Sequence, residues 1–359
     1  MHFRSLHIKE VRKETPDCVS ISFDIPDRWK QEFQFRQGQN ITIKRHIDGE
    51  EVRRSYSICS SPFDNELRIA VKKLASGQFS VFANEQLKKG DILEVLPPSG
   101  KFSTELHSGQ AKNYIAFAAG SGITPVISII KTTLFTEPKS RFTLVYGNRS
   151  RSSIIFREAL EALKNKFMER FSVYHVLSRE ITDAPVNQGR LNADKCRELT
   201  RLIDFGLCDE FFLCGPEKMI YSVASYLTQT DVDKRKIHVE LFTVPGQDRA
   251  MNEKKLVAEK STYKGKLSRV ILNLDGHTLH FALPYDSFSI LDAALQEGAD
   301  LPYACKGGVC STCRAKLLEG SIEMDANYAL EPDEIEAGYI LTCQSHPRSE
   351  HLVVDFDVK

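Results

Sequence analysis

The sequence predicts a multidomain protein, with an antiparallel β-barrel, then an α/β domain built on a parallel sheet, and last an α+β domain. Three observations predict this order. Residues 1 to about 105 contain short, alternating strands separated by turn residues, whereas strands alternate with helical segments from about residue 110. From residue 268 a hairpin pattern precedes a short helix and a cysteine-rich loop. The predicted boundaries are 1–106, 107–243, a polar linker at 244–266, and 267–359.

The first domain carries a short motif between two predicted strands. Arg54, Tyr56 and Ser57 bring together a cation, an aromatic ring and a hydroxyl, which suit a phosphate, a flat heterocycle and a polar ring edge. An ordinary strand with one exposed Arg and a half-buried Tyr would give the same pattern. Further on, Gly77 and Ser80 flank a predicted helix start, where backbone N–H groups can hold pyrophosphate oxygens.

The second domain has its glycines between strand and helix. Gly120 and Gly122 follow a buried strand run and precede Thr124 and Pro125, so the backbone there can approach a pyrophosphate. The run Cys214–Pro216 ends a later strand of the same predicted sheet. For Cys214 alone, the alternative is a small buried core residue. The sequence therefore predicts a dinucleotide site at this edge of the sheet.

The loop after the second strand of this domain bears on nucleotide choice. It contains Arg149 and Arg151 with several serines, and no Asp or Glu occurs between Tyr146 and Arg157. Such a loop suits the 2′-phosphate of NADPH, whereas NADH sites usually place an acid beside the ribose. We therefore expect NADPH, with NADH as the alternative. A solvated basic loop that caps the next helix would look the same.

Four cysteines give the C-terminal domain its chemistry. Cys305, Cys310 and Cys313 follow the C-x4-C-x2-C spacing, and Cys343 is a distant fourth. This is the plant-type spacing for a [2Fe–2S] cluster held by four thiolates. A zinc site usually pairs two C-x2-C knuckles or adds His, and no second C-x2-C occurs. We expect these four residues to be the metal ligands.

The net charge of zero hides an asymmetry. Residues 267–359 hold 6 Lys/Arg and 15 Asp/Glu, about −9, and the remainder carries the opposite charge. Opposite charges favour docking of the C-terminal domain onto the rest of the chain or onto a basic partner. No 18-residue apolar stretch occurs, so we expect no membrane span, and we expect no nucleic-acid partner. Nine cysteines without a secretory signal predict the cytoplasm.

These motifs, in this order, resemble the ferredoxin–NADP reductase family, and the C-terminal part resembles a plant-type ferredoxin of the β-grasp fold. The resemblance implies that Arg54 contacts the flavin phosphate, that Tyr56 stacks on the isoalloxazine and that Ser57 lies near its N5. It also implies that Gly77 to Ser80 bind the pyrophosphate of FAD. This loop favours FAD, although relatives with a C-terminal ferredoxin domain include FMN users.

The same resemblance assigns the nucleotide side. Gly120, Gly122 and Thr124 would hold the nucleotide together with Gly215 and Pro216. Cys214 would lie near the nicotinamide. Glu240 and Phe242 would lie beside the flavin near the hydride path. From the residues alone, an edge-strand carboxylate and a core Phe remain the alternative. Tyr56, Ser57, Cys214 and Glu240 are thus the expected catalytic residues.

The whole chain resembles the reductase components of bacterial multicomponent oxygenases. The order of domains implies an oxidoreductase that passes electrons from NAD(P)H through FAD and the cluster to an acceptor protein. The cysteine run, Y-G-N-R and M-D-A-N-Y-A-L-E (Met324 to Glu331) look most similar to reductases of phenylacetyl-CoA epoxidase complexes. The implied acceptor is a di-iron oxygenase of phenylacetate degradation. Alternatives are another acceptor (a steroid or aromatic hydroxylase, a desaturase or a hybrid-cluster protein) or an iron–sulfur redox sensor.

Overall fold

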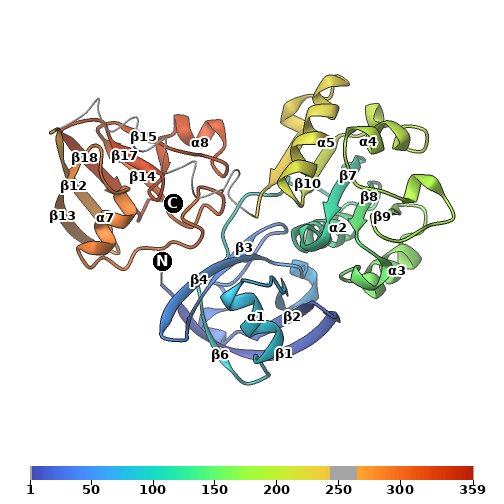
Figure 1. Cartoon of the computed structure of the whole chain (residues 1–359), viewed down its shortest axis with the longest axis horizontal. Helices are drawn as coiled ribbons and strands as arrows, with labels where there is room; N and C mark the ends of the chain where they lie inside the picture. Colours follow the sequence, from blue (N-terminus) through green and yellow to red (C-terminus); the bar gives the residue numbers. More distant parts are fainter. Residues whose placement is uncertain (1, 243–264, 359) are drawn as a thin grey trace. The chain divides into compact units, whose positions relative to one another are not determined.

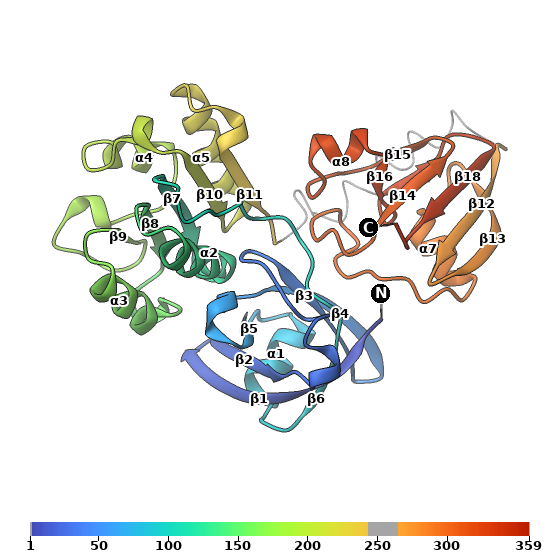
Figure 2. The same ribbon diagram turned by 180° about the vertical axis from the view of Figure 1, so that it is seen from behind.

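The computed structural model describes residues 2–242 and 265–358, coloured along the chain in Figure 1 and seen from behind in Figure 2. By its internal contacts the chain divides into two compact units, one of them Phe3–Phe242 and the other containing the described residues from 265 onward. The predicted linker at 244–266 lies almost wholly outside the described residues. Within the described residues, no helix combines the length and the apolar character needed to cross a membrane.

The first part of the N-terminal unit is a six-stranded antiparallel sheet in the order β4-β3-β6-β1-β2-β5. Its two end strands are joined by an isolated bridge between Ile58 and Ile69, which closes the sheet into the predicted barrel. Alternation points Leu6, Ile21 and Ile41 into a core where each is fully buried. The elements are β1 (Arg4–Thr15), β2 (Cys18–Asp24), β3 (Asn40–Ile47), β4 (Glu50–Ser57), β5 (Leu67–Lys72), α1 (Gln78–Glu85) and β6 (Ile92–Val95), with 3-10 turns η1 (Asp27–Trp29) and η2 (Pro62–Asp64).

The second part is a five-stranded parallel sheet in the order β11-β10-β7-β8-β9, as the alternation of strands and helices predicts. Because the strands are parallel, their carboxyl ends meet at one edge. The strands are β7 (Asn113–Ala119), β8 (Arg141–Asn148), β9 (Phe171–Leu177), β10 (Glu210–Cys214) and β11 (Ile237–Glu240). The helices are α2 (Ile123–Thr136), α3 (Arg157–Lys166), α4 (Ala193–Leu199) and α5 (Glu217–Gln229), with 3-10 turns η3 (Gly120–Gly122), η4 (Arg151–Ser153), η5 (Pro185–Asn187), η6 (Phe205–Leu207) and η7 (Lys234–Lys236).

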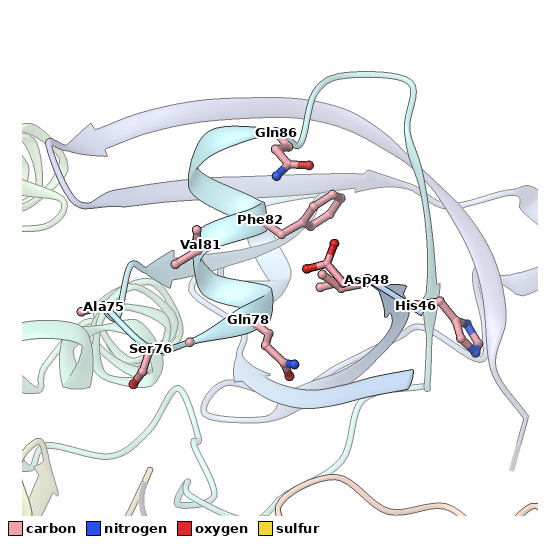
Figure 3. Close-up of a pocket in the computed structure, with 10 residues that line it drawn as sticks. His46, Asp48, Ala75, Ser76, Gln78, Val81, Phe82 and Gln86 are labelled. Atoms are coloured by element: carbon pink, nitrogen blue, oxygen red, sulfur yellow. The ribbon is translucent and has the colours of Figure 1, made fainter. Parts of the chain in front are cut away.

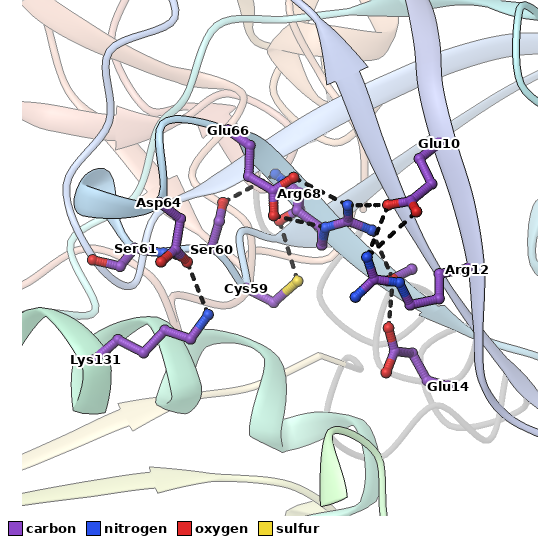
Figure 4. Close-up of polar contacts among 11 residues, drawn as sticks. Glu10, Arg12, Glu14, Cys59, Ser60, Ser61, Asp64, Glu66, Arg68 and Lys131 are labelled. Atoms are coloured by element: carbon purple, nitrogen blue, oxygen red, sulfur yellow. Dashed lines mark hydrogen bonds and ion pairs between the residues drawn. The ribbon is translucent and has the colours of Figure 1, made fainter. Parts of the chain in front are cut away.

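A shared core holds these two parts together. Cys18, Cys59, Ala70 and Phe102 of the first part belong to the same buried cluster as α2 and the strands of the second. Polar contacts continue this junction along α2. The Ser128 hydroxyl donates to the Ser60 carbonyl over 2.7 Å. Lys131 Nζ lies 2.8 Å from Asp64 Oδ2, as Figure 4 shows. The barrel and the edge of the parallel sheet are therefore fixed relative to each other.

Arg68 organises the polar face of the barrel beside this junction (Figure 4). Its guanidinium donates to Ser20 Oγ over 3.0 Å and to Glu66 Oε1 over 2.9 Å, and it also pairs with Glu10. The Ser20 hydroxyl in turn donates to Glu14 Oε1 over 2.6 Å. The hydrogen bond from Arg68 is the main cause that lowers the pKa of Glu10. Because Arg68 is buried, these carboxylates neutralise a charge that burial alone would disfavour.

The C-terminal unit is a mixed five-stranded sheet in the order β13-β12-β18-β14-β16, with one short helix, α7, packed in its core. β12 and β18 are parallel and the other pairs are antiparallel. The Asp275–Gly276 turn joins β12 to β13 and so forms the hairpin that the pattern from residue 268 predicts. The elements are β12 (Leu267–Leu274), β13 (His277–Pro284), α7 (Ile290–Gln296), β14 (Arg314–Glu319), β15 (Ile322–Met324), α8 (Pro332–Glu336), β16 (Tyr339–Leu341), β17 (Ser345–Pro347) and β18 (His351–Asp355), with β15 and β17 forming a separate two-stranded sheet.

Candidate active site

Strand β4 carries the first group of candidate residues. Arg54 and Tyr56 are two positions apart, so strand alternation puts them on one face. The Tyr56 ring packs on the buried ring of Phe79 from α1, with centroids 5.5 Å apart. Arg54 is exposed, and within residues 2–242 and 265–358 its guanidinium makes one hydrogen bond, from Nη1 to the Arg53 carbonyl over 2.7 Å. Ser57, the last residue of β4, is buried. This face offers a supported aromatic ring beside an available cation.

The start of α1 is the second group. Gly77 precedes the helix, and no side chain caps its first turn. Ser80 Oγ donates to the Gly77 carbonyl over 3.1 Å and accepts the Leu74 N–H over 3.1 Å, so this hydroxyl shapes the loop. The backbone N–H groups of Ser80 and of the rest of the first helical turn can therefore bind an anion. The local fold thus suits a phosphate that the backbone binds.

A pocket of about 420 Å³ lies against the same helix start (Figure 3). One wall is the tip of the β3–β4 hairpin, His46 to Asp48, and the other is the loop before α1 with one face of that helix. Figure 3 shows Phe82, Asp48 and Gln78 around this space. Its volume is in the range of small-molecule sites, and it combines an aromatic ring with amide and carboxylate groups. The pocket thus adjoins the helix start where the sequence predicts a pyrophosphate site.

The glycine loop of the second part lies where β7 meets α2. Gly120 has φ of +55°, which a residue without a Cβ adopts freely. A Cβ on Gly122 would come within 2.0 Å of the Cys214 carbonyl oxygen, so only glycine lets the two strand ends approach this closely. The buried Thr124 hydroxyl donates to the Ser121 carbonyl over 3.0 Å and closes the loop. Gly215 and Pro216 continue the β10 end directly into α5.

Cys214 and Glu240 end neighbouring strands of this sheet. They are register partners in the parallel β10–β11 pair, and Cys214 is fully buried. Burial raises the pKa of the Cys214 thiol well above its usual value, and the nearby Glu240 adds to the rise. Glu240 is half-buried as a residue, but its Oε2 atom is covered and has no partner within the described residues. Desolvation raises the pKa of Glu240 to about 8, so the carboxyl is protonated at neutral pH.

Two further candidate residues, Phe242 and Arg149, follow the ends of strands β11 and β8. Phe242 follows β11 and is 40% exposed, so part of its ring is accessible for stacking. Arg149 follows β8 and is exposed. The neighbouring Arg151 belongs to the loop that the sequence predicts to bind a 2′-phosphate, but its charge is already paired. Its guanidinium pairs with Glu180, with Nε and Oε1 3.2 Å apart.

Lys72 is a further candidate, which no sequence motif marks. It ends β5 of the barrel, and its Nζ would lie 3.9 Å from a Cβ built on Gly120. Its recorded ion pair, with Asp17, is long at 3.5 Å. A cation from the barrel therefore reaches the glycine loop of the parallel sheet. The sequence shows only that Lys72 ends an alternating strand. Its place beside the glycine loop follows from the tertiary fold.

The four cysteines of the C-terminal unit lie in two pairs. Cys305 lies beside Cys310, and Cys313 beside Cys343. In each pair the neighbouring thiol stabilises one thiolate, which lowers the pKa of Cys310 to about 5 and also lowers that of Cys343. Within the described residues, no group of three or more such side chains surrounds a single ion site. Two thiolates for each of two irons is the arrangement that a [2Fe–2S] cluster requires.

Backbone N–H groups complete this cysteine loop. The Gly307 N–H donates to Cys305 Sγ over 3.3 Å, and those of Thr312 and Gly308 lower the pKa of Cys310 and Cys343. A Cβ on Gly308 would lie 2.9 Å from the Ala326 carbonyl oxygen, because the 325–330 segment lies against the loop. The donors directed at the sulfurs fit thiolates that hold a cluster.

Comparison with known proteins agrees with these three regions. Residues 5–104 match the model of the oxidoreductase FAD-binding domain, residues 117–225 that of the oxidoreductase NAD-binding domain, and residues 272–348 that of the 2Fe-2S iron-sulfur cluster binding domain. Among solved structures, phthalate dioxygenase reductase is similar, with a TM-score of 0.57 and 22% identity over 99% of this chain and 98% of that one. This likeness extends the three-domain fold over the whole chain.

Two curated relatives cover almost the full length. A component of the 1,2-phenylacetyl-CoA epoxidase of Escherichia coli (strain K12) is 44% identical over 99% of this chain and 98% of its own. The ferredoxin reductase component of 3-ketosteroid-9-alpha-monooxygenase from Rhodococcus rhodochrous is 35% identical over 98% and 96%. The protein is an electron-transfer reductase that uses NAD(P)H, FAD and a [2Fe–2S] cluster. The chain belongs to the family of FAD- and NAD(P)-dependent oxidoreductases with a C-terminal [2Fe–2S] ferredoxin domain.

Proposed function

We propose that this reductase takes electrons from NADPH and delivers them to the oxygenase of a phenylacetyl-CoA epoxidase complex, a di-iron protein by the resemblance noted above. The 44% identity to a component of such an epoxidase over nearly the whole of both chains is the observation that carries the proposal. The relative from a 3-ketosteroid monooxygenase is 35% identical, so a steroid-hydroxylating oxygenase is the second candidate acceptor. The cytoplasm remains our expectation for its location.

In this proposal the barrel binds FAD. Arg54 and the N–H groups at Gly77 to Ser80 bind the pyrophosphate, Tyr56 supports the isoalloxazine ring, and Ser57 lies near its N5. The pocket between the β3–β4 hairpin and α1 takes the adenosine half. Its position at an uncapped helix start, with Gly77 and Gln78 in its lining, supports this assignment. FAD, when bound, accepts two electrons as a hydride and releases them singly.

The carboxyl edge of the parallel sheet binds the nucleotide. Gly120, Gly122, Gly215 and Pro216 let the backbone approach the pyrophosphate, while Thr124 holds the loop in shape through its bond to Ser121. Lys72 neutralises the pyrophosphate from the barrel side. Arg149 binds the 2′-phosphate of NADPH. The available cation of Arg149 supports NADPH, although Arg151 is already neutralised by Glu180.

Cys214, Glu240 and Phe242 border the place where nicotinamide and flavin meet in this proposal. The buried Cys214 thiol stays protonated and gives a compact, uncharged wall. Glu240 holds a proton at neutral pH, and its unpartnered Oε2 can hydrogen-bond to a bound ring. Phe242 covers the ring by stacking and excludes water. Cys305, Cys310, Cys313 and Cys343 hold the cluster from which electrons leave.

Reconstitution tests the acceptor. The purified protein is mixed with NADPH and, in separate reactions, with the oxygenase components of a phenylacetyl-CoA epoxidase and of a 3-ketosteroid monooxygenase. We expect coupled product formation with the epoxidase and at least tenfold less with the steroid enzyme. The reverse order would transfer the assignment to the steroid oxygenase. If NADPH bleaches the flavin but neither oxygenase is reduced, both proposed acceptors are contradicted. If NADPH fails to reduce the flavin of the loaded protein, the reductase chemistry itself is refuted.

A further inference from the structure

Tyr146 is a fully buried tyrosine of the parallel sheet that has no part in the function proposed above. It lies on β8, where its register partners are Ala118 of β7 on one side and His175 of β9 on the other. The rings of Tyr146 and His175 lie with their centroids 6.0 Å apart. A hydroxyl in such an interior needs a hydrogen-bond partner, because burying it unbonded costs free energy.

The partner of this hydroxyl is the backbone of the glycine loop. Tyr146 Oη donates to the Gly120 carbonyl over 2.9 Å, a normal length for such a bond. Burial raises the pKa of the Tyr146 hydroxyl above its ordinary value, so the group keeps its proton and remains a donor. The Thr124 hydroxyl donates in the same way to the Ser121 carbonyl, over 3.0 Å. Two hydroxyls therefore hold two successive carbonyls of the loop.

A carbonyl that is held in place also fixes the N–H of the same peptide unit. In a planar trans peptide the C=O and the N–H point in opposite directions. The Gly120 carbonyl points to the buried Tyr146 hydroxyl, so the Ser121 N–H points away from it. Gly120 and Ser121 are both partly exposed. The Ser121 N–H is thus directed toward the side of the loop that a ligand can reach.

The surroundings of this N–H suit an anion. Gly120 has a left-handed φ of +55°, and the chain then continues through the right-handed turn η3 into α2. A left-handed residue followed by right-handed ones turns backbone N–H groups toward one concave side, which binds anions. Lys72 adds a positive charge from the barrel, since its Nζ would lie 3.9 Å from a Cβ built on Gly120. The orientation of the 120–121 peptide therefore affects how well the loop binds a phosphate.

We propose that Tyr146 is a positioning residue for nucleotide binding, whose hydroxyl holds the 120–121 peptide so that the Ser121 N–H is directed at the pyrophosphate of the nucleotide. The inference rests on the proposed assignment of the Gly120–Gly122 loop to that pyrophosphate. Tyr146 is completely covered by protein, so it acts only through the loop. NADPH and NADH both carry the pyrophosphate, so loss of the hydroxyl should weaken the binding of both equally.

The test compares Tyr146→Phe with the unmodified protein, each full-length and loaded with flavin and cluster. Ferricyanide reduction gives kcat and KM for NADPH and for NADH. ADP-ribose, which carries the pyrophosphate, and adenosine, which lacks it, are used as competing inhibitors. One misdirected hydrogen bond to a charged group corresponds to about a tenfold loss of affinity. Both KM values and the inhibition constant of ADP-ribose should rise about tenfold, with kcat and the inhibition constant of adenosine within twofold.

Tyr114→Phe is the matched control. Tyr114 is a second buried tyrosine of the same sheet, and its hydroxyl donates to Glu137 Oε2 over 2.9 Å. It lies near the amino end of β7, whereas the glycine loop follows the carboxyl end of that strand. Each variant loses one buried, hydrogen-bonded hydroxyl, so both should lower the melting temperature by a similar amount. Only Tyr146→Phe should change the inhibition constant of ADP-ribose.

Thr124→Val tests the second hydroxyl of the loop. It removes the hydrogen bond to the Ser121 carbonyl and keeps the shape of the side chain, so it should weaken ADP-ribose binding in the same way as Tyr146→Phe. Thr124→Ser retains the hydroxyl and should stay within about threefold of the unmodified protein.

The outcomes separate this inference from the assignment on which it rests. If Gly122→Ala raises the inhibition constant of ADP-ribose and Tyr146→Phe does not, the loop binds the pyrophosphate and only the role of Tyr146 fails. If neither variant changes this constant, the assignment of the loop fails as well. Equal losses for ADP-ribose and adenosine in Tyr146→Phe would mean that the whole site is disturbed, which overturns the inference. An effect of Tyr114→Phe as large as that of Tyr146→Phe would overturn it too.

Discussion

The cluster loop and the nucleotide edge are built in opposite ways. Three of the four cysteines lie within nine residues, Cys305 to Cys313, and the backbone of that stretch supplies most N–H donors to the sulfurs. The nucleotide edge joins the ends of β7, β8, β10 and β11 and a lysine from the barrel. A local site depends on its own loop, whereas an assembled site depends on how closely separate strands approach. Substitutions in the two regions should therefore fail differently.

The largest effect is expected at the cluster. Cys310→Ser removes one thiolate, so cluster-dependent reduction of cytochrome c by NADPH should fall by on the order of a hundredfold or more. Ferricyanide reduction by the flavin should stay within twofold. Cys208→Ser, a buried cysteine of the parallel-sheet domain, is the matched control and should retain both activities. Loss of ferricyanide reduction in Cys310→Ser would mean that the cluster also supports the flavin site.

The second-largest effect is expected from a methyl group added at the nucleotide edge, where the ends of several strands meet. In Gly122→Ala the new Cβ meets the Cys214 carbonyl, so β7 and β10 must separate, at a cost of about 1–3 kcal/mol. We expect the KM for NADPH and for NADH to rise together, by about tenfold, with the absorption of the cluster unchanged. Gly109→Ala is the control, because nothing lies within 4 Å of its Cβ position. An unchanged KM would show that the close approach is not needed for nucleotide binding.

Lys72→Ala should have a smaller effect on the same edge. Loss of a cation near the Gly120 loop weakens binding of the pyrophosphate, which both nucleotides carry, so both KM values should rise about three- to fivefold. Lys73→Ala removes the next lysine, which instead pairs with Glu85 over 2.6 Å, and should change neither. An increase confined to NADPH would place Lys72 at the 2′-phosphate instead.

We expect Glu240→Gln to change the pH dependence of protein stability more than the rate of flavin reduction by NADPH. The pKa of Glu240 is about 8 in the folded protein against an ordinary value of 4.5, so the folded state binds an extra proton between these values. The free energy of unfolding should then fall as pH rises from 6 to 8, by about 2 kcal/mol. The glutamine variant lacks this proton, and its urea stability should stay flat over the same range. A decline as steep as in the unmodified protein would assign the titration to another group.

Much of the fold could be predicted from local patterns. The Asp275–Gly276 turn, the glycine loop before α2 and the cysteine spacing each depend on residues adjacent in sequence, so periodicity and turn chemistry predict them. The pairing of Arg151 with Glu180 could not be predicted in this way, because β9 and its loop come later in the chain. The same holds for Lys72 beside Gly120. In both cases the partner residue lies on or after another strand. A pattern of neighbouring residues therefore does not show that the two residues are close in space.

By itself the sequence determined the cofactor chemistry: four cysteines with the spacing of a two-iron cluster, a flavin motif and a glycine loop, each made of neighbouring residues. The tertiary structure decided how charge and space are distributed around them. It paired the cysteines two by two, left Glu240 Oε2 buried with no hydrogen-bond partner among the described residues, and neutralised Arg151 through Glu180. The physical reason is that desolvation and ion pairing depend on distances between strands, which are set only when the sheets pack.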